Sequence, residues 1–162
     1  MLTEVTGDIL LTKAQAIAHG VAPNDSFSTG LALSLRERWP AMYKDFRHYY
    51  QLGHPKSGRA WGWVGADGKR IVNLFTQEAA PKHGGHPGRA TLENLNHALR
   101  ELYNIAEKEK FSSLALPRLA TGVGGLDWYQ VKPLIVKHLG NLQIPVIIYV
   151  HYSKGVAADE KI

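Results

Sequence analysis

Cysteine is absent from the sequence. This absence excludes a disulfide framework, a thiolate zinc site and a cysteine nucleophile, and it favours an intracellular protein. Long apolar runs are also missing, since none approaches the roughly 20 residues that a membrane span needs. The first residues lack a basic segment followed by an apolar core, which a secretory leader would contain. We therefore expect a soluble, cytoplasmic protein without a membrane partner.

The excess of positive charge is small and spread along the chain. Lys plus Arg outnumber Asp plus Glu by 19 to 14, which gives a formal net charge of +5. This balance favours polyanionic or phosphate-bearing partners through long-range attraction. Because the basic residues are not gathered into a run, a solvated surface explains them better than a dedicated nucleic-acid-binding face.

The order of apolar runs predicts an α/β fold. The 162 residues, 44% of them hydrophobic, suffice for one domain with a full core and leave little room for a second. Strands are expected at residues 2–5, 16–18, 60–64, 70–75, 114–117 and 145–149. Helices are expected to begin near residues 30, 40, 91 and 127. This alternation favours a three-layer α/β/α sandwich around a central mixed β-sheet.

The expected fold leaves a short segment at the C-terminal end. We predict a single domain over residues 1–152 and a flexible tail over residues 153–162. No internal repeat or low-complexity segment divides the chain.

A glycine-rich segment, TGVGGLDWY at residues 121–129, joins an expected strand to an expected helix. Backbone N–H groups can approach phosphate oxygens in such a link because glycine has no Cβ, and the helix N-terminus adds a positive dipole. A second glycine-containing turn precedes the helix expected near residue 30. Ligands of α/β sheets bind beyond strand ends, where both turns fall. The two turns together predict a site for a phosphorylated ligand, although either one alone is also compatible with a purely structural turn.

Four short motifs occur in the order and places that resemble those of a macrodomain. They are VTGDI (5–9), IAHG (17–20), STGLA (28–32) and LPRLATGVGGLDW (116–128). The resemblance covers about residues 2–150. It is nearest to a branch with terminal ADP-ribose protein glycohydrolase, the antitoxin that removes ADP-ribose from DNA, and yeast-type ADP-ribose 1″-phosphate phosphatase. It implies binding of ADP-ribose, or of ADP-ribosylated protein or nucleic acid, with no metal or other cofactor, and we expect a monomer.

The resemblance also implies roles for individual residues. Asp8 resembles the carboxylate that accepts a hydrogen bond from the adenine amino group, with the Ile9 backbone beside it; a turn-forming Asp after Gly7 is the alternative. The loops at 28–31 and 122–126 resemble those that close over the pyrophosphate and the distal ribose. The expected ADP-ribose-binding residues are Asp8, Ile9, His19, Ser28, Thr29, Gly30, Leu31, Thr76, Pro117, Leu119, Thr121, Gly122, Val123, Gly124, Gly125 and Leu126.

The residues that would carry catalysis are harder to identify. Glycohydrolases of this branch use a lysine after a strand end and an acid inside the last glycine loop, and these positions hold Gln77 and Gly124 here. An amide cannot form a Schiff base, and glycine cannot transfer a proton. The remaining candidate catalytic residues are His19, which matches a histidine of the phosphatase, and Asp127. A hydrogen-bonded structural role is the alternative for His19, a helix cap is the alternative for Asp127, and Lys82 is read as a loop charge.

Two histidines, His83 and His86, lie in a loop rich in Gly and Pro. No carboxylate joins them at a familiar zinc spacing, so we expect no metal site. We expect this loop to flank the ligand mouth and to select what is attached to the distal ribose.

Three hypotheses about function remain open. The first is a hydrolase of ADP-ribosyl adducts of protein or nucleic acid, or of ADP-ribose 1″-phosphate, which the lack of an attached module favours. The second is a non-catalytic ADP-ribose reader, which Gln77 and Gly124 favour. The third is a structural domain that has lost the ligand, which the joint presence of both glycine loops and Asp8 disfavours.

Overall fold

The computed structural model of the chain describes residues 1–82 and 85–162, and it contains a six-stranded sheet with the order β1-β6-β5-β2-β4-β3. His83, which entered the metal-site hypothesis, therefore lies outside the described residues. The strands are β1 (Leu2–Gly7), β2 (Ala16–Val21), β3 (Ala60–Val64), β4 (Arg70–Phe75), β5 (Leu114–Pro117) and β6 (Val146–Tyr152). Among them, β3 runs antiparallel to β4, while β1, β6, β5, β2 and β4 pair in parallel. The sheet is mixed, as predicted.

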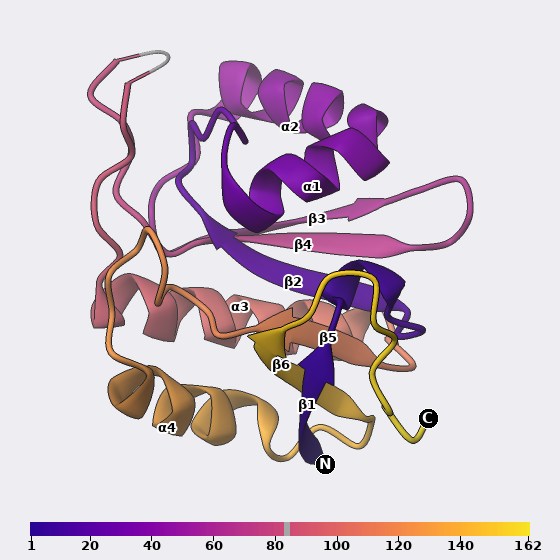
Figure 1. Cartoon of the computed structure of the whole chain (residues 1–162). Helices are drawn as coiled ribbons and strands as arrows, with labels where there is room; N and C mark the ends of the chain where they lie inside the picture. Colours follow the sequence, from indigo (N-terminus) through magenta and orange to yellow (C-terminus); the bar gives the residue numbers. More distant parts are fainter. Residues whose placement is uncertain (83–84) are drawn as a thin grey trace.

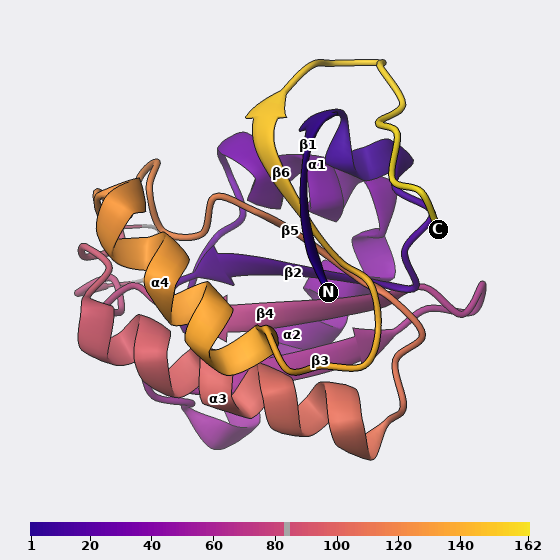
Figure 2. The same ribbon diagram turned by 90° about the horizontal axis from the view of Figure 1, so that it is seen from below.

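Helices cover both faces of the sheet (Figure 1). They are the 3-10 helix η1 (Ile9–Leu11) and the α-helices α1 (Gly30–Arg38), α2 (Pro40–Gly53), α3 (Leu92–Lys108) and α4 (Trp128–Leu139). α1 and α2 lie on one face, and α3 and α4 lie on the other (Figures 1 and 2). The predicted three-layer α/β/α sandwich is confirmed. Within the described residues, no helix combines the length and apolar character that crossing a membrane requires.

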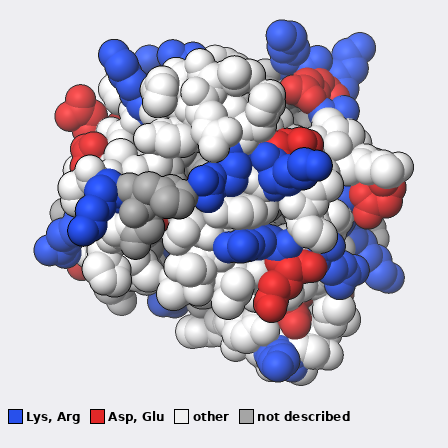
Figure 3. Space-filling model, turned by 90° about the horizontal axis from the view of Figure 1, so that it is seen from above, with Lys and Arg blue, Asp and Glu red and all other residues white. Residues whose placement is uncertain are grey.

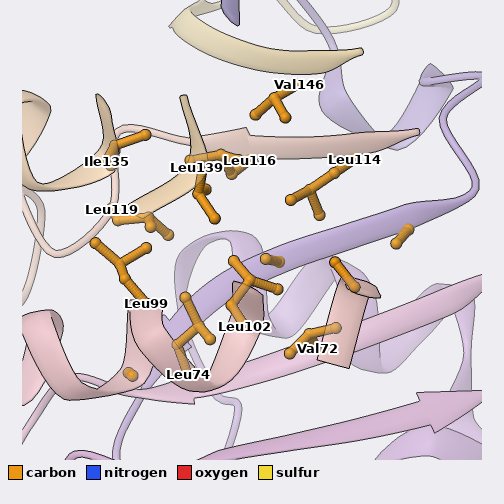
Figure 4. Packing of buried hydrophobic residues seen from close by; sticks show 14 of the residues in the cluster. Val72, Leu74, Leu99, Leu102, Leu114, Leu116, Leu119, Ile135, Leu139 and Val146 are labelled. Carbon is orange, nitrogen blue, oxygen red and sulfur yellow. The ribbon is translucent and has the colours of Figure 1, made fainter. Parts of the chain in front are cut away.

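α3 packs on the sheet through leucines spaced three or four residues apart. Leu99 and Leu102 are fully buried, and Figure 4 shows both side chains close to Leu74 of β4. The helix begins where its sequence predicts, because Thr91 Oγ1 accepts a hydrogen bond of 3.0 Å from the backbone N of Asn94. An apolar stripe and a capped start thus fix α3 beneath the strands that lead to the site.

On the opposite face, α2 contributes aromatic side chains to a second core. The ring centroid of Phe46 lies 6.1 Å from those of Trp61 and Phe75, and Tyr49 stacks on Trp61 at 5.1 Å. Rings at these separations add favourable edge and stacking contacts to the burial of apolar area. The aromatic stripe of this helix is core packing.

The C-terminal residues make contacts with the rest of the chain that the sequence does not indicate. Residues 153–162, predicted as a flexible tail, run beside η1 in both ribbon views (Figures 1 and 2). The backbone N of Asp8 donates to Val156 O at 2.8 Å, and Glu160 is only 8% exposed. Hydrophobic periodicity does not indicate these contacts, because hydrogen bonds to distant groups can hold a polar segment and leave no local pattern, and the flexibility of these residues stays a prediction. The domain limit at residue 152 stays a prediction.

Candidate functional site

The carboxyl ends of the five parallel strands lie at the same end of the sheet, beyond which the ligand sites of α/β folds are found. Two cavities of about 390 and 520 Å³ are found there. Both are lined by Gly30, Leu31 and Pro117. The two cavities therefore adjoin, and the start of α1 and the end of β5 form the middle of one elongated groove.

The smaller cavity has a mainly apolar lining. Its lining residues are Gly7, Ile9, Leu10, Gly30, Leu31, Ser34, Pro117, Tyr149 and Tyr152. Aliphatic and aromatic walls with few polar groups suit an apolar ring system, which such cavities bury on binding. We call this cavity the apolar end of the groove.

Asp8 lies next to the apolar end, between two of its lining residues, and is buried. Its Oδ1 accepts from the backbone N of Leu10 at 3.0 Å, and its Oδ2 accepts from the backbone N of Gly155 at 2.9 Å. The first bond makes Asp8 the N-cap of η1, so the turn-forming role is present. Each carboxylate oxygen has a second lone pair, and these two bonds leave further acceptor capacity.

The larger cavity, which we call the polar end, begins at the N-terminus of α1. Thr29 is the N-cap but makes no side-chain capping bond, and the backbone N–H groups of Gly30, Leu31 and Ala32 meet no acceptor in the described residues. Unsatisfied N–H groups and the positive end of the helix dipole make such a terminus attractive to an anion. Gly30 has a φ of 61°, which favours glycine at this position.

The glycine-rich loop after β5 forms the facing wall of the polar end. The turn is closed by a bond of 3.0 Å from Gly125 N to Gly122 O, and the N–H groups of Gly122, Val123 and Gly124 meet no acceptor in the described residues. A Cβ on Gly124 would lie 2.7 Å from Ala120 O, which is closer than packing allows. Glycine is therefore needed here to keep the loop folded against its own backbone.

Asp127, a candidate catalytic residue, and Gln77, which occupies the position where the resemblance implies a lysine, both have other contacts. Asp127 Oδ1 accepts from the backbone N of Tyr129 at 2.9 Å and caps α4, and Asp127 lines neither cavity. Gln77 lines the polar end, but its Nε2 donates to Gly88 O at 3.1 Å. The helix-cap alternative for Asp127 is thus present in the structure.

His19 forms part of the inner wall of the polar end and is almost fully buried. It faces Asn73 across β2 and β4, and its Nε2 lies 2.6 Å from Asn73 Oδ1. Because an amide oxygen only accepts, the imidazole donates in this bond. Burial lowers the pKa of His19 from 6.5 to about 4, although the bond to Asn73 and the Asp25 carboxylate act in the opposite direction. Its imidazole is neutral at pH 7 and only weakly basic.

The remaining ionisable side chains of the polar end are Asp25, Arg118 and His86. Both Asp25 oxygens accept from backbone N–H groups of the same loop, at 2.8 and 3.1 Å. The Arg118 guanidinium lies 5.4 Å from the ring centroid of Trp128, and its buried Nε has no partner in the described part of the chain. No group of three or more His, Asp or Glu side chains among residues 1–82 and 85–162 is placed to hold a metal ion.

The groove brings together most of the residues expected from the sequence. Those that line it are Ile9, His19, Ser28, Thr29, Gly30, Leu31, Pro117, Leu119, Gly122, Val123 and Gly124. Those that do not are Asp8, Thr76, Thr121, Gly125, Leu126 and Asp127. Lining residues that sequence reasoning missed include Leu10, Asp25, Arg118, Tyr149 and Tyr152. The available signal was position for four of them, because Leu10, Asp25 and Arg118 follow strands and Tyr152 ends one at the carboxyl end of the sheet, whereas Tyr149 lies inside β6.

Known proteins similar to this chain share its fold. The Macro domain family model matches residues 68–135. The DNA ADP-ribosyl glycohydrolase of Thermus aquaticus is 29% identical over 153 residues, which make up 92% of this chain and 41% of that protein. The structure described as the macrodomain of Thermus aquaticus DarG matches with a TM-score of 0.81 at 28% identity, over 93% of this chain and 98% of that one.

A third match is the structure described as Thermosipho africanus DarTG in complex with ADP-ribose. Its TM-score is 0.79 at 22% identity, over 96% of this chain and 42% of that one, and at this identity it supports the fold alone. The chain spans about two fifths of the length of the DNA ADP-ribosyl glycohydrolases that it matches. Its strand order, its two-part groove and these similarities together show that the chain has the macrodomain fold.

Proposed function

We propose that this chain binds ADP-ribose in the groove and hydrolyses the bond that joins ADP-ribose to a protein, a nucleic acid or a phosphate. One observation carries the proposal: an apolar end and a polar end adjoin where the α1 N-terminus and the glycine-rich loop present free N–H groups. ADP-ribose has the same order of parts, with a flat base, a doubly anionic pyrophosphate and a polar distal ribose. The printed names of the similar DNA ADP-ribosyl glycohydrolases support this ligand.

Each part of the ligand has a matching part of the groove in this proposal. The adenine lies at the apolar end, where Asp8 accepts a hydrogen bond from the 6-amino group beside the Ile9 backbone. The pyrophosphate lies between residues 28–32 and 122–124, which act as phosphate-binding loops through their N–H groups. The distal ribose lies at the polar end, close to His19 and to the loop that carries His86.

Charge outside the groove adds little to this recognition. On the face shown in Figure 3, Lys and Arg side chains are spread out, with Asp and Glu side chains between them. Such a surface gives weak long-range attraction rather than a dedicated track for a polyanion. We therefore assign the selection of the ligand to the groove itself, and the proposal covers protein and nucleic-acid adducts equally.

In the proposed reaction the oxygen of a water molecule bonds to C1″ of the distal ribose while the bond from C1″ to the adduct atom breaks; one proton of the water ends on the leaving group, and free ADP-ribose keeps the other as its 1″-hydroxyl. Orientation by the two loops and neutralisation of the pyrophosphate by N–H groups supply the rate enhancement. We assign no proton transfer to Asp127, because it caps α4 outside the groove. We assign none to His19 either, because its imidazole is buried and weakly basic; His19 only lines the groove. His86 is the exposed imidazole of the described lining and is the side chain that we would test as a proton donor.

A non-catalytic reader is the second candidate function, and one observation favours it. The positions of the relatives' catalytic lysine and acid hold Gln77 and Gly124, both of which line the polar end. Gln77 is held by Gly88 O, and Gly124 is needed for the turn. A groove with this lining retains the means to bind ADP-ribose while lacking the side chains of the lysine mechanism.

Calorimetric titration with ADP-ribose, followed by release assays, tests both candidates. The wild-type chain should bind ADP-ribose, and Asp8→Ala should weaken binding at least tenfold because the adenine loses its acceptor. Glu37→Ala, which removes an exposed carboxylate at the far end of α1, serves as the control. Release of ADP-ribose from modified protein, modified DNA or ADP-ribose 1″-phosphate would establish the hydrolase, and binding without release would establish the reader. A wild-type chain that does not bind ADP-ribose would sink both.

A further inference from the structure

The segment after β6 crosses the outside of the apolar end and makes contact with two of its walls. We call residues 153–160 the strap. Its Ser153 N donates to Gly7 O at 3.0 Å, its Val156 O accepts from Asp8 N at 2.8 Å, and its Gly155 N donates to Asp8 Oδ2 at 2.9 Å. The strap thus holds both the backbone and the carboxylate of Asp8.

The far end of the strap is anchored by Glu160, whose carboxylate is buried. Its Oε1 accepts from the backbone N of Lys13 at 2.9 Å. Its Oε2 accepts from the Tyr149 hydroxyl at 2.6 Å and from the Thr12 hydroxyl. Thr12 follows η1 directly, and Tyr149 lies on β6 and lines the apolar end. A single side chain therefore ties the strap to β6, through a residue that lines this cavity, and to the segment that follows η1.

The hydrogen bonds of Glu160 are those of a buried, anchored carboxylate and not those of an exposed C-terminal segment. A carboxylate loses much of its hydration on burial, and three donors that point at it replace that hydration. Burial and the hydrogen bond to Glu160 raise the pKa of the Tyr149 hydroxyl above its ordinary value, so this hydroxyl stays a donor. Removing the Glu160 carboxylate would leave these donors without an acceptor, and the strap would lose its anchor.

The hydrogen bond from Gly155 N to Asp8 Oδ2 helps to fix the orientation of the Asp8 carboxylate group. Leu10 N holds Oδ1 from within the same turn, and Gly155 N holds Oδ2 from the strap. A carboxylate held at both oxygens is an oriented acceptor. It accepts from a 6-amino group of a purine, whereas a 6-oxo group presents lone pairs to it and is disfavoured.

We propose that the strap, anchored by Glu160 as a positioning residue, sets the selectivity of the apolar end for 6-amino over 6-oxo purines by orienting Asp8. This inference rests on the proposed binding of ADP-ribose. Glu160 does not touch the ligand; it acts through Tyr149 and through the path of the strap to Asp8. The hydrogen bonds of Glu160 and Gly155 are therefore part of the recognition machinery as well as part of the fold.

The test compares the dissociation constants of ADP-ribose and of its hypoxanthine counterpart, inosine diphosphate ribose. In the wild-type chain the adenine ligand should bind at least tenfold more tightly. Glu160→Ala should reduce this ratio at least threefold, and Glu160→Gln, which keeps the shape and one acceptor oxygen, should reduce it less. Asp159→Asn is the matched control, because Asp159 is exposed and has no hydrogen-bond or ion-pair partner in the described residues; its ratio should equal the wild-type ratio.

The ratio separates positioning from simple loss of stability. A destabilised but otherwise intact groove would bind both ligands more weakly by the same factor, and the ratio would not change. Glu160 variants that retain a cooperative thermal transition and the wild-type ratio would therefore overturn the inference. If Glu160→Ala fails to fold, Glu160→Gln gives the same comparison. A wild-type chain that binds neither nucleotide would instead contradict the proposed function, which is a different result.

Discussion

His19 and Asn73 form a polar pair inside an otherwise apolar part of the sheet. Their side chains face each other across β2 and β4, and both residues are almost fully buried. A buried polar group is tolerated when it is hydrogen-bonded, and each of these two provides the partner of the other. At the scale of the residue, the histidine that sequence reasoning placed in catalysis has a clear structural task.

This pair makes stability depend on pH in a defined window. The pKa of His19 is about 4 in the folded chain and 6.5 as its ordinary value, so only the unfolded chain takes up this proton between these pH values. The free energy of unfolding should therefore fall as the pH is lowered from about 6.5 to about 4, by about 3 kcal/mol from this residue. Denaturant titrations at several pH values measure this decrease.

A substitution isolates the contribution of His19 from those of other groups. His19→Gln keeps a donor for Asn73 but does not titrate, and its stability should decline less steeply over the same pH range. For the control His48→Gln, at an exposed position on α2, the free energy of unfolding should decline with falling pH as it does for the wild-type chain. Equal slopes for His19→Gln and the wild type would show that burial does not depress the pKa of His19.

At the scale of the element, two helices begin with threonine but use it differently. Thr91 accepts a hydrogen bond from Asn94 N at the start of α3, whereas Thr29 makes no side-chain capping bond at the start of α1. The α1 terminus is thus left open toward the polar end of the groove. An uncapped helix start is a cost to local stability that a bound anion can offset.

This difference predicts unequal effects of the same substitution. Thr91→Ala should lower the free energy of unfolding by about 1 kcal/mol, because a capping bond is lost. Thr29→Ala should change it by less than about 0.5 kcal/mol, as expected of an exposed side chain without such a bond. Chemical denaturation of both variants measures this contrast, and an equal loss for both would contradict the uncapped state of α1.

The glycine-rich loop offers a second contrast between neighbouring positions. A Cβ on Gly124 would meet Ala120 O at 2.7 Å and Ala90 Cβ at 2.9 Å, whereas a Cβ on Gly122 would meet nothing within 4 Å. Gly124→Ala should therefore destabilise the chain by about 1–3 kcal/mol, and Gly122→Ala by less than about 1 kcal/mol. Thermal unfolding of the two variants decides the matter, and a Gly124→Ala chain as stable as the wild type would show that the loop relaxes freely.

At the scale of the whole molecule, the sequence contains enough periodicity to predict the layers. The start of α3 near residue 91 and the link from β5 to α4 over residues 121–129 each depend on neighbours in sequence, and the structure confirms both. The anchoring of Glu160 by Thr12 and Tyr149 depends on residues far apart in the chain, and no local pattern records it. Tyr149 and Arg118 line the groove because β6 and β5 lie side by side in the sheet, and this neighbourhood of strands is not recorded in any local sequence pattern.

Ligand binding should stabilise the molecule as a unit. If ADP-ribose binds only the folded chain, a concentration of 100 times the dissociation constant adds about 2.7 kcal/mol. For a chain of this size the midpoint of thermal unfolding should rise by roughly 5–10 °C. Scanning calorimetry with and without ADP-ribose measures this shift, with ribose 5-phosphate as a ligand that lacks the base. An equal shift with both compounds would argue against a role for the apolar end.

The pairing of β1 with β6 also has a consequence for how the molecule is made. Leu2 of β1 pairs with Val146 of β6, and the strap reaches back to Asp8. During synthesis the first strand leaves the ribosome long before its partner exists, and closing so long a loop is slow. In the described sheet β1 pairs with β6 alone, so β1 must wait without a partner strand until residues 146–152 have been made. The order of synthesis therefore lets the apolar end of the groove acquire its shape only after β6 and the strap have been made.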